Sequence, residues 1–393
     1  MQFSKRMERL ETSVFSTLDE EKQRYLKQGK EVYDFTIGSP NIAPSKEIIQ
    51  ALIDAAKQPQ SYMYALHDID ELRQTVKKWY QTRYEVELDA DTEILSLQGS
   101  QEGLAHIALA ICDEGDIVLI PSPSYPVFAN GPKIAGAEIY EMPMREEHEY
   151  LIQFDEIPKD IARKAKMMII SYPNNPTGAI MTREDLEPIA EIIKEKDLYV
   201  ISDEIYAELT YGQDHCSIAS LPGMRDRTII INGFSKSFAM TGWRMGFATG
   251  PELIMQQILK IHQFAIMAAP TTSQYAAIEA MTNGEEDVQI MRNAYNQRRR
   301  FVLELFSEMG LKCFEPEGAF YLFPCIKEFG MSSDEFANRF LHEEEVAVIP
   351  GTAFGDCGEG FLRISYAYSI EELKEALGRL ANFVERLRKE KNL

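Results

Sequence analysis

Four continuous apolar runs occur in the central part of the chain, at residues 117–120, 167–170, 198–201 and 228–231. Segments of ten or more residues with helical periodicity lie between them, and this alternation begins near Ser45. A strand that is covered on both faces is apolar throughout, and parallel strands need helical crossovers. The pattern therefore predicts an α/β fold in which helices cover a mostly parallel sheet.

The two ends of the chain show a different pattern. At the N-terminal end we predict a polar helical segment at residues 1–30 and a short strand at 31–37. At the C-terminal end we predict a long charged helix at 287–309, two β-like pieces at 319–323 and 361–365, and an amphipathic helix at 369–387 that opens with a capping box. We therefore expect a large domain at 46–285 and a smaller α/β domain at 286–393. Residues 1–45 would form an N-terminal arm and part of the small domain.

Polar residues follow each of the four apolar runs. They are Pro121-Ser122, Ser171-Tyr172, Ser202-Asp203 and Asn232-Gly233. In open α/β sheets the ligand crevice lies beyond the carboxyl ends of the strands. The chemistry of this protein is therefore expected at these four positions.

Composition and charge narrow the class of protein. The chain has 393 residues, of which 45% are hydrophobic and 26% charged, as in ordinary globular proteins. Its 41 Lys and Arg against 62 Asp and Glu give a net charge of -21, which argues against a nucleic-acid partner. No apolar run approaches the roughly 20 residues that span a bilayer, and the N-terminus lacks a signal-peptide core. We expect a cytoplasmic protein without a membrane partner.

Cysteine and histidine give no sign of a metal site. The five cysteines are scattered without a CxxC pair, which indicates reduced structural residues. The six histidines form no HExxH or similar cluster, so we predict no metal.

Two motifs have both a structural and a functional interpretation. Gly99, Ser100 and Gln101 precede a helical run, so their backbone amides can bind phosphate at a helix N-terminus, although most such turns are simple caps. Tyr125 follows Ser122-Pro123-Ser124, and its ring either faces an aromatic ligand or packs between prolines.

Three further motifs carry candidate chemistry. Asn175 lies in a rigid loop between Pro173 and Pro176, where its amide suits oxygen recognition. Asp203 follows a buried strand, and by itself it is most simply explained as a cap. Lys236 stands among Ser, Gly and aromatic residues directly after the last predicted strand, where a solvated lysine is unexpected. The neighbouring sequence lacks the second glycine of a hydrolase nucleophile elbow.

Taken together and in this order, the motifs resemble the class I/II, fold-type I aminotransferases that use pyridoxal 5'-phosphate. The stretch 233–246 is similar to the lysine signature of that family, and the likeness extends from residue 38 to 363. It implies that Lys236 forms a Schiff base with the cofactor and carries a proton from the substrate α-carbon. The implied reaction is ping-pong transfer of an amino group from an L-amino acid to a 2-oxo acid.

The resemblance also implies roles for other residues at the cofactor ring. Asp203 would pair with the pyridine nitrogen and keep it protonated. Asn175 and Tyr206 would hydrogen-bond the phenolic oxygen, and Tyr125 would stack on the ring.

Further implied contacts hold the phosphate and the substrate. The phosphate would be bound by Gly99, Ser100, Gln101, Ser235 and Arg244. Arg363 would grip the substrate carboxylate in a bidentate fork, with Asn175 beside it and with the Gly38 backbone close by. In a homodimer, Tyr64, chosen over Tyr62, would reach the neighbouring subunit's phosphate.

The substrate and two other activities stay open from the sequence. Aspartate-specific members often carry Lys where this chain has Gln101, and the GSQEGLAH stretch looks like members that act on LL-diaminopimelate or alanine; an aromatic substrate is a further alternative. A carbon-sulfur β-lyase on the same scaffold is the second candidate activity. A cofactor-binding regulatory module is the third, but only about 40 residues precede the main domain.

Overall fold

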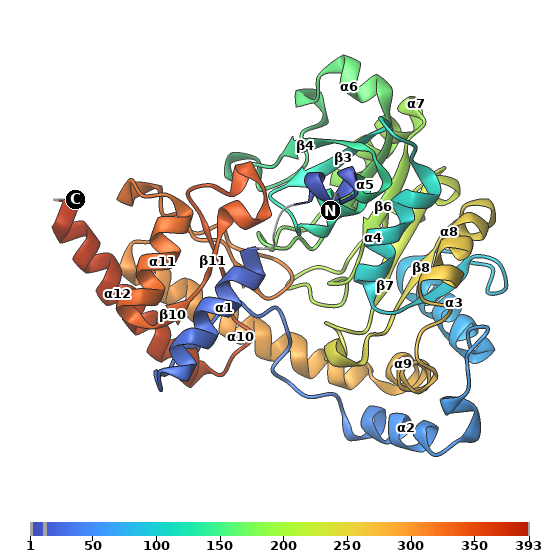
Figure 1. Ribbon diagram of the computed structural model, residues 1–393, viewed down its shortest axis with the longest axis horizontal. Coiled ribbons are helices and arrows are strands. Elements are labelled where there is room, and N and C mark those ends of the chain that lie inside the picture. The colour runs from blue at the N-terminus through green and yellow to red at the C-terminus, as the bar shows by residue number, and fades with distance from the viewer. Residues whose placement is uncertain (1–2, 11–13, 392–393) are drawn as a thin grey trace.

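A seven-stranded sheet forms the centre of the larger part of the molecule, here called the large lobe (Figure 1). The structure, a computed structural model, describes residues 3–10 and 14–391. The strands follow the order β2-β8-β7-β6-β5-β3-β4; β8 pairs in antiparallel fashion with β2 and β7, and all the other neighbouring strands pair in parallel. Their bounds are β2 Ile94–Leu97, β3 Ile117–Ser122, β4 Glu138–Pro143, β5 Ala165–Ser171, β6 Tyr199–Asp203, β7 Thr228–Gly233 and β8 Gly246–Thr249.

Helices cover both faces of this sheet. Along β5, Met167 and Ile169 pack with apolar residues of α4, α5 and α8, whereas Met168 and Ile170 pack with those of α7. Successive side chains of a strand point to opposite faces, so a doubly covered strand must be apolar at every position. The helices of this lobe are α2 Lys46–Ala56, α3 Asp70–Tyr84, α4 Ser100–Ile111, α5 Val127–Ala135, α6 Lys159–Lys164, α7 Arg183–Lys196, α8 Glu252–Ala265 and α9 Thr271–Asn283.

The second part of the molecule, here called the small lobe, combines the C-terminal segment with the N-terminal helix. A three-stranded antiparallel sheet has the order β11-β12-β9, and β1 pairs in parallel with β10. The elements are α1 Val14–Lys27, β1 Tyr33–Asp34, β9 Tyr321–Leu322, α11 Ser333–Glu344, β10 Val346–Ala347, β11 Ile349–Pro350, β12 Leu362–Ser365 and α12 Ile370–Lys391.

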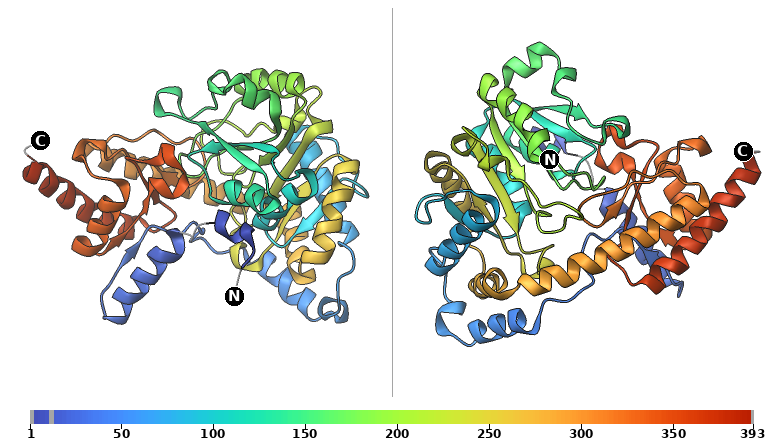
Figure 2. Two further views of the ribbon diagram at one scale, coloured as in Figure 1. Left: turned by 45° about the horizontal axis from the view of Figure 1, so that its top comes forward. Right: turned by 180° about the vertical axis from the view of Figure 1, so that it is seen from behind.

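One long helix connects the lobes. Helix α10, Glu285–Met309, begins beside α9 and ends against α12, as the rear view in Figure 2 shows. Glu285, Glu286 and Asp287 occupy its first turn, where negative charge is favourable at a helix N-terminus. Among the described residues, no helix has the length and apolar character needed to cross a bilayer.

The α/β fold predicted from the sequence is confirmed. The runs 117–120, 167–170 and 228–231 lie entirely in strands, and the run 198–201 does so from Tyr199 onward; each strand extends beyond the C-terminal end of its run. The predicted capping box is present, since Ser369 and Glu372 each bond the other's backbone N–H. The strand predicted at 31–37 was too long, because only Tyr33–Asp34 pairs with another strand. Strands β2, β4 and β8 were not predicted.

Candidate active site

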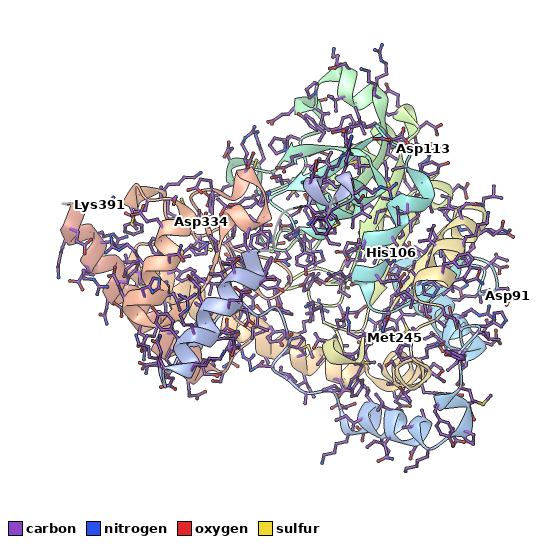
Figure 3. The ribbon with its side chains drawn as sticks, viewed as in Figure 1. Asp91, His106, Asp113, Met245, Asp334 and Lys391 are labelled. Carbon is purple, nitrogen blue, oxygen red and sulfur yellow. The ribbon has the colours of Figure 1, made fainter. Side chains whose placement is uncertain are left out.

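A cavity of about 380 Å³ lies where the two lobes meet. The large lobe contributes the loops that follow β5, β6 and β7 and the first turn of α4, and the small lobe contributes Tyr321 and Arg363. Figure 3 shows the side chains of both lobes, with His106 on α4 of the large lobe and Asp334 on α11 of the small lobe. The parallel register of the sheet brings the predicted residues together at one edge, as expected for a doubly wound fold.

Lys236 follows β7 and faces the cavity. Its Nζ donates a hydrogen bond to the Gly38 carbonyl oxygen. Burial lowers the pKa of Lys236 to about 8, and the nearby positive charges of Arg363 and Arg244 act in the same direction, whereas Asp203 opposes them. At this pKa about a tenth of the lysine is an unprotonated amine at pH 7, far more than for an ordinary lysine, and a nucleophile or base needs that form.

Asp203 ends β6 and is almost completely buried. In the sheet register it lies opposite Ser171 on β5 and Ile231 on β7, so it lies close to the loop that carries Lys236. Its Oδ1 accepts a hydrogen bond from the Ile205 N–H at 3.3 Å. Burial raises the pKa of Asp203 to about 7 against the effect of this bond. Such a carboxyl suits a cationic partner within the cavity.

The first turn of α4 lies against the guanidinium of Arg244. Gly99 has a φ of 81°, a conformation that side chains disfavour, and a Cβ at this position would collide with Arg244. Arg244 Nη1 donates to the Thr241 carbonyl at 2.9 Å. Ser100, Gln101 and Ser235 line the same part of the cavity. A helix N-terminus beside a guanidinium is a site for an anion such as phosphate.

Arg363 is 2% exposed, which is unusual for an arginine. Its Nη1 donates to Asn175 Oδ1 at 3.3 Å and its Nη2 to the Thr36 carbonyl at 2.5 Å, while its Nε has no hydrogen-bond partner among the described residues. Within the described part of the chain, no carboxylate forms an ion pair with it. A buried guanidinium without a counterion is suited to bind a carboxylate ligand.

Two tyrosines predicted for the ring site also line the cavity. Tyr206 OH lies 2.8 Å from Tyr321 OH, and burial raises the pKa of Tyr206 well above its ordinary value, so the phenol stays neutral. Tyr125 OH donates to Gln101 Oε1 at 3.3 Å.

Tyr64 is the one predicted site residue that lies away from this cavity. Its side chain is 88% exposed, and Tyr62 is 75% exposed. The remaining predicted residues line the cavity, apart from Gly99, which lies beside Arg244. The described residues contain no group of three or more His, Cys, Asp or Glu side chains placed to hold a metal ion.

Sequence reasoning missed two aromatic residues of the site. Tyr321 contacts Tyr206, and the guanidinium of Arg363 lies 4.6 Å from the centre of its ring. Phe15 on α1 also lines the cavity, with Arg363 5.5 Å from its ring centre. Tyr321 lies in a run predicted as a strand, and Phe15 is an apolar residue in a polar segment, so only the folded chain shows that they reach the site.

The residues present fit pyridoxal 5'-phosphate. The cavity combines an amine of lowered pKa, a buried carboxyl and a helix N-terminus beside Arg244. These groups match the aldehyde, the ring nitrogen and the phosphate of that cofactor, respectively. The space that Gly99 leaves for Arg244 is part of the fit, because any side chain there would fill it.

Comparisons with known proteins support the same family. Residues 30–380 match the model of the family described as aminotransferase class I and II. The chain is 40% identical to the putative aminotransferase YugH of Bacillus subtilis, over 90% of this chain and 92% of that protein. It is 37% identical to the LL-diaminopimelate aminotransferase of Aquifex aeolicus, over 97% and 99% of the two chains.

A solved structure supports the same family. The aromatic aminotransferase from Pyrococcus horikoshii superposes with a TM-score of 0.88 at 38% identity, over 94% of this chain and 99% of that one. These matches support amino transfer and not the lyase alternative. The protein uses pyridoxal 5'-phosphate, as its family does. The chain therefore belongs to the class I and II aminotransferases.

Proposed function

We propose that this aminotransferase moves an amino group from an L-amino acid to a 2-oxo acid in two alternating half-reactions within the cavity around Lys236. One observation carries the assignment of the site: a lysine of lowered pKa shares one cavity with a buried carboxyl, Asp203, and a buried guanidinium, Arg363. The three groups suit proton transfer, ring binding and carboxylate binding, respectively.

The roles of the ring-binding residues follow from their chemistry. When bound, pyridoxal 5'-phosphate supplies an electron sink for the charge that develops at the substrate α-carbon. Asp203 would accept a hydrogen bond from the protonated ring nitrogen. Asn175 and Tyr206 would donate to the phenolic oxygen, and Tyr125 would cover the ring face.

The phosphate of the cofactor and the carboxylate of the substrate would be bound at two separate positions. The phosphate would be bound by the first turn of α4 together with Ser235 and Arg244. The substrate carboxylate would bind Arg363, whose unpartnered Nε supports a further ligand contact. Gly38 and Asn175 flank this position, since each bonds one of the two cationic side chains.

Lys236 would act as the proton carrier. Its Nζ would remove the proton from the substrate α-carbon and hold it for return during the same half-reaction. The carbonyl of Gly38 accepts from Nζ and keeps the amine on the cavity side. A positive charge on Lys236 is disfavoured by burial, which supports its action as a base.

Lys236→Ala tests the assignment. Removing the amine should reduce turnover at least 10³-fold, on the order of the upper range for a lost general base together with a lost covalent tether. Borohydride treatment of the loaded wild type should attach the cofactor to the peptide that contains residue 236. Lys133→Ala, which changes a lysine of α5 outside the cavity, is the control. Wild-type turnover in the Lys236 variant would refute the site.

For the substrate, we infer that a side chain without net negative charge is preferred to that of aspartate. The three cationic residues lining the cavity already have proposed partners, and Phe15, Leu104 and Tyr125 add apolar surface. A half-reaction screen would follow the absorbance change of the loaded enzyme with each amino acid. Phenylalanine, alanine and LL-diaminopimelate should react with a higher kcat/KM than aspartate. A preference for aspartate would contradict the inference.

We further propose a cytoplasmic homodimer whose subunits share their active sites. Exposure of Tyr62, Met63 and Tyr64 on one loop supports an interface there. We also propose the division into a large domain at 46–285 and a small domain formed by 286–393 with part of the arm. The pairing of β1 with β10 supports this division.

A further inference from the structure

A fully buried carboxylate adjoins Asp203 in the chain. Glu204 is 0% exposed, and none of the roles proposed above uses it. Its Oε1 accepts hydrogen bonds from Ser202 Oγ at 3.0 Å and Ser217 Oγ at 2.7 Å, and its Oε2 accepts one from Tyr80 OH at 3.1 Å. Burying a carboxylate is costly unless several donors surround it. The three hydroxyls provide such a shell of donors.

The same network reaches the strand that leads to Lys236. Tyr80 OH accepts a hydrogen bond from Asn232 Nδ2 at 2.8 Å, and Asn232 lies near the end of β7. The backbone N–H of Glu204 donates to the Ile231 carbonyl at 2.8 Å. Glu204 is thereby fixed relative to β7 by both its backbone and its side chain.

Among the described ion pairs, no permanently charged side chain lies beside the Glu204 carboxylate. His215 Nε2 lies 3.4 Å from Glu204 Oε2. Burial raises the pKa of Tyr80 and Tyr84 well above the ordinary value, so both phenols stay neutral. Glu208, the next carboxylate, is bonded by Tyr84 and pairs with Arg83 at 3.2 Å.

The negative charge of Glu204 acts on Asp203. Burial raises the pKa of Asp203 to about 7, and the charge of Glu204 adds to the increase. A negative potential that makes a carboxyl hold a proton more tightly also stabilises a cation bound to that carboxyl. In this site the cation is the protonated ring nitrogen.

We propose that Glu204 is a positioning residue that supplies a second negative charge behind Asp203 and thereby strengthens the pairing of Asp203 with the protonated ring nitrogen of the cofactor. The inference rests on the proposed contact between Asp203 and that nitrogen. Glu204 acts through Asp203 and does not itself touch the cofactor or substrate.

Glu204→Gln tests the proposal through binding to the apoenzyme. Two ligands are compared: pyridoxal 5'-phosphate and its 1-deaza analogue, in which a C–H replaces the ring nitrogen. The variant should bind pyridoxal 5'-phosphate about tenfold more weakly, the effect of one pKa unit, and should bind the analogue as the wild type does. Equal weakening for both ligands would reveal a merely structural role and overturn the proposal, as would unchanged affinity for both.

Matched variants separate the possible outcomes. Glu208→Gln makes the same change at a carboxylate held by its own tyrosine and should preserve the wild-type preference between the ligands. Glu204→Asp retains the charge and should also preserve it. If Glu204→Gln does not fold, His215→Arg places a permanent cation beside the same carboxylate and should reduce the preference; an unchanged preference would again refute the proposal.

Asp203→Asn separates this inference from the proposed function. If this variant loses the preference while Glu204→Gln keeps it, only the role of Glu204 fails. If Asp203→Asn also keeps the preference, the contact between Asp203 and the ring nitrogen fails, and the role of Glu204 fails with it.

Discussion

At the scale of single residues, the site depends on side chains whose ionisation is shifted by burial. The amine of Lys236 has a pKa of about 8 because burial and Arg363 disfavour its charged form, while Asp203 favours it. Only the neutral amine is nucleophilic, and its fraction rises as the pH passes through the pKa. Lys236 is thus half unprotonated near pH 8, where an ordinary lysine is almost fully charged.

This shift predicts the pH dependence of Lys236 reactivity in the apoenzyme. The rate of acetylation of Lys236 by acetic anhydride, followed by mass spectrometry of its peptide, should rise with a midpoint near pH 8. Arg363→Gln removes a positive charge and should move the midpoint to higher pH. Asp203→Asn removes a negative charge and should move it to lower pH. A wild-type midpoint near the ordinary lysine value would contradict the prediction.

The sequence revealed those site residues that have an unusual local context. Lys236 follows a buried strand among small and aromatic residues, and Asn175 lies between two prolines, so both were found from the chain itself. Tyr321 and Phe15 have ordinary local contexts. Tyr321 meets Tyr206 only because the small lobe folds against the large one, and no local pattern encodes a contact across 115 residues.

At the scale of elements, the N-terminus of α4 combines a backbone requirement with an electrostatic one. Gly99 must adopt a positive φ and must leave room for Arg244. An alanine there would have to adopt a backbone conformation that essentially only glycine populates, at a cost on the order of 1–3 kcal/mol, and it would displace the guanidinium. The two effects act on different properties, because strain lowers stability whereas displacement lowers affinity for the phosphate.

Gly99→Ala should therefore weaken the binding of pyridoxal 5'-phosphate by about tenfold or more, as loss of a charge-assisted hydrogen bond would. Binding of pyridoxal without the phosphate should change much less. Gly115→Ala is the matched control, since Gly115 also has a positive φ, of 87°, but a Cβ added there would meet no atom within 4 Å. The Gly115→Ala variant should be less stable than the wild type but should bind both ligands with wild-type affinity. Titration of each apoprotein with both ligands would measure these affinities. If Gly99→Ala weakened the binding of both ligands equally, the prediction would be wrong.

Strand prediction succeeded where burial on both faces imposes an apolar run. Residues 167–170 and 228–231 are examples, and they lie at the centre of the sheet. The missed strands have weaker patterns: β8 reads Gly-Phe-Ala-Thr, and β2 contains Ser96, whose polar groups bond Asp68. Glycine and polar residues reduce the strand signal, and only pairing with β2 and β7 makes β8 a strand.

At the scale of the whole molecule, a chain of net charge -21 encloses a cavity with three cationic side chains. Lys236, Arg244 and Arg363 all face this cavity, where an anionic cofactor and a substrate carboxylate would bind. The remaining predicted contact, Tyr64, lies on an exposed loop together with Tyr62, Met63 and Leu66. An exposed apolar loop that carries the predicted residue missing from the cavity is consistent with completion of the site by a second copy of the chain.

A shared site predicts that two inactive variants complement each other. Lys236→Ala lacks the amine in its own site, and Tyr64→Ala would lack the hydroxyl that reaches its partner's site. A mixed dimer of these variants contains one site with both native groups. Random mixing makes half of the dimers mixed, so co-expression should restore about a quarter of wild-type activity. Tyr62→Ala, the control, should be active alone. If the mixture is no more active than the sum of its parents, each chain completes its own site and the role of Tyr64 is wrong.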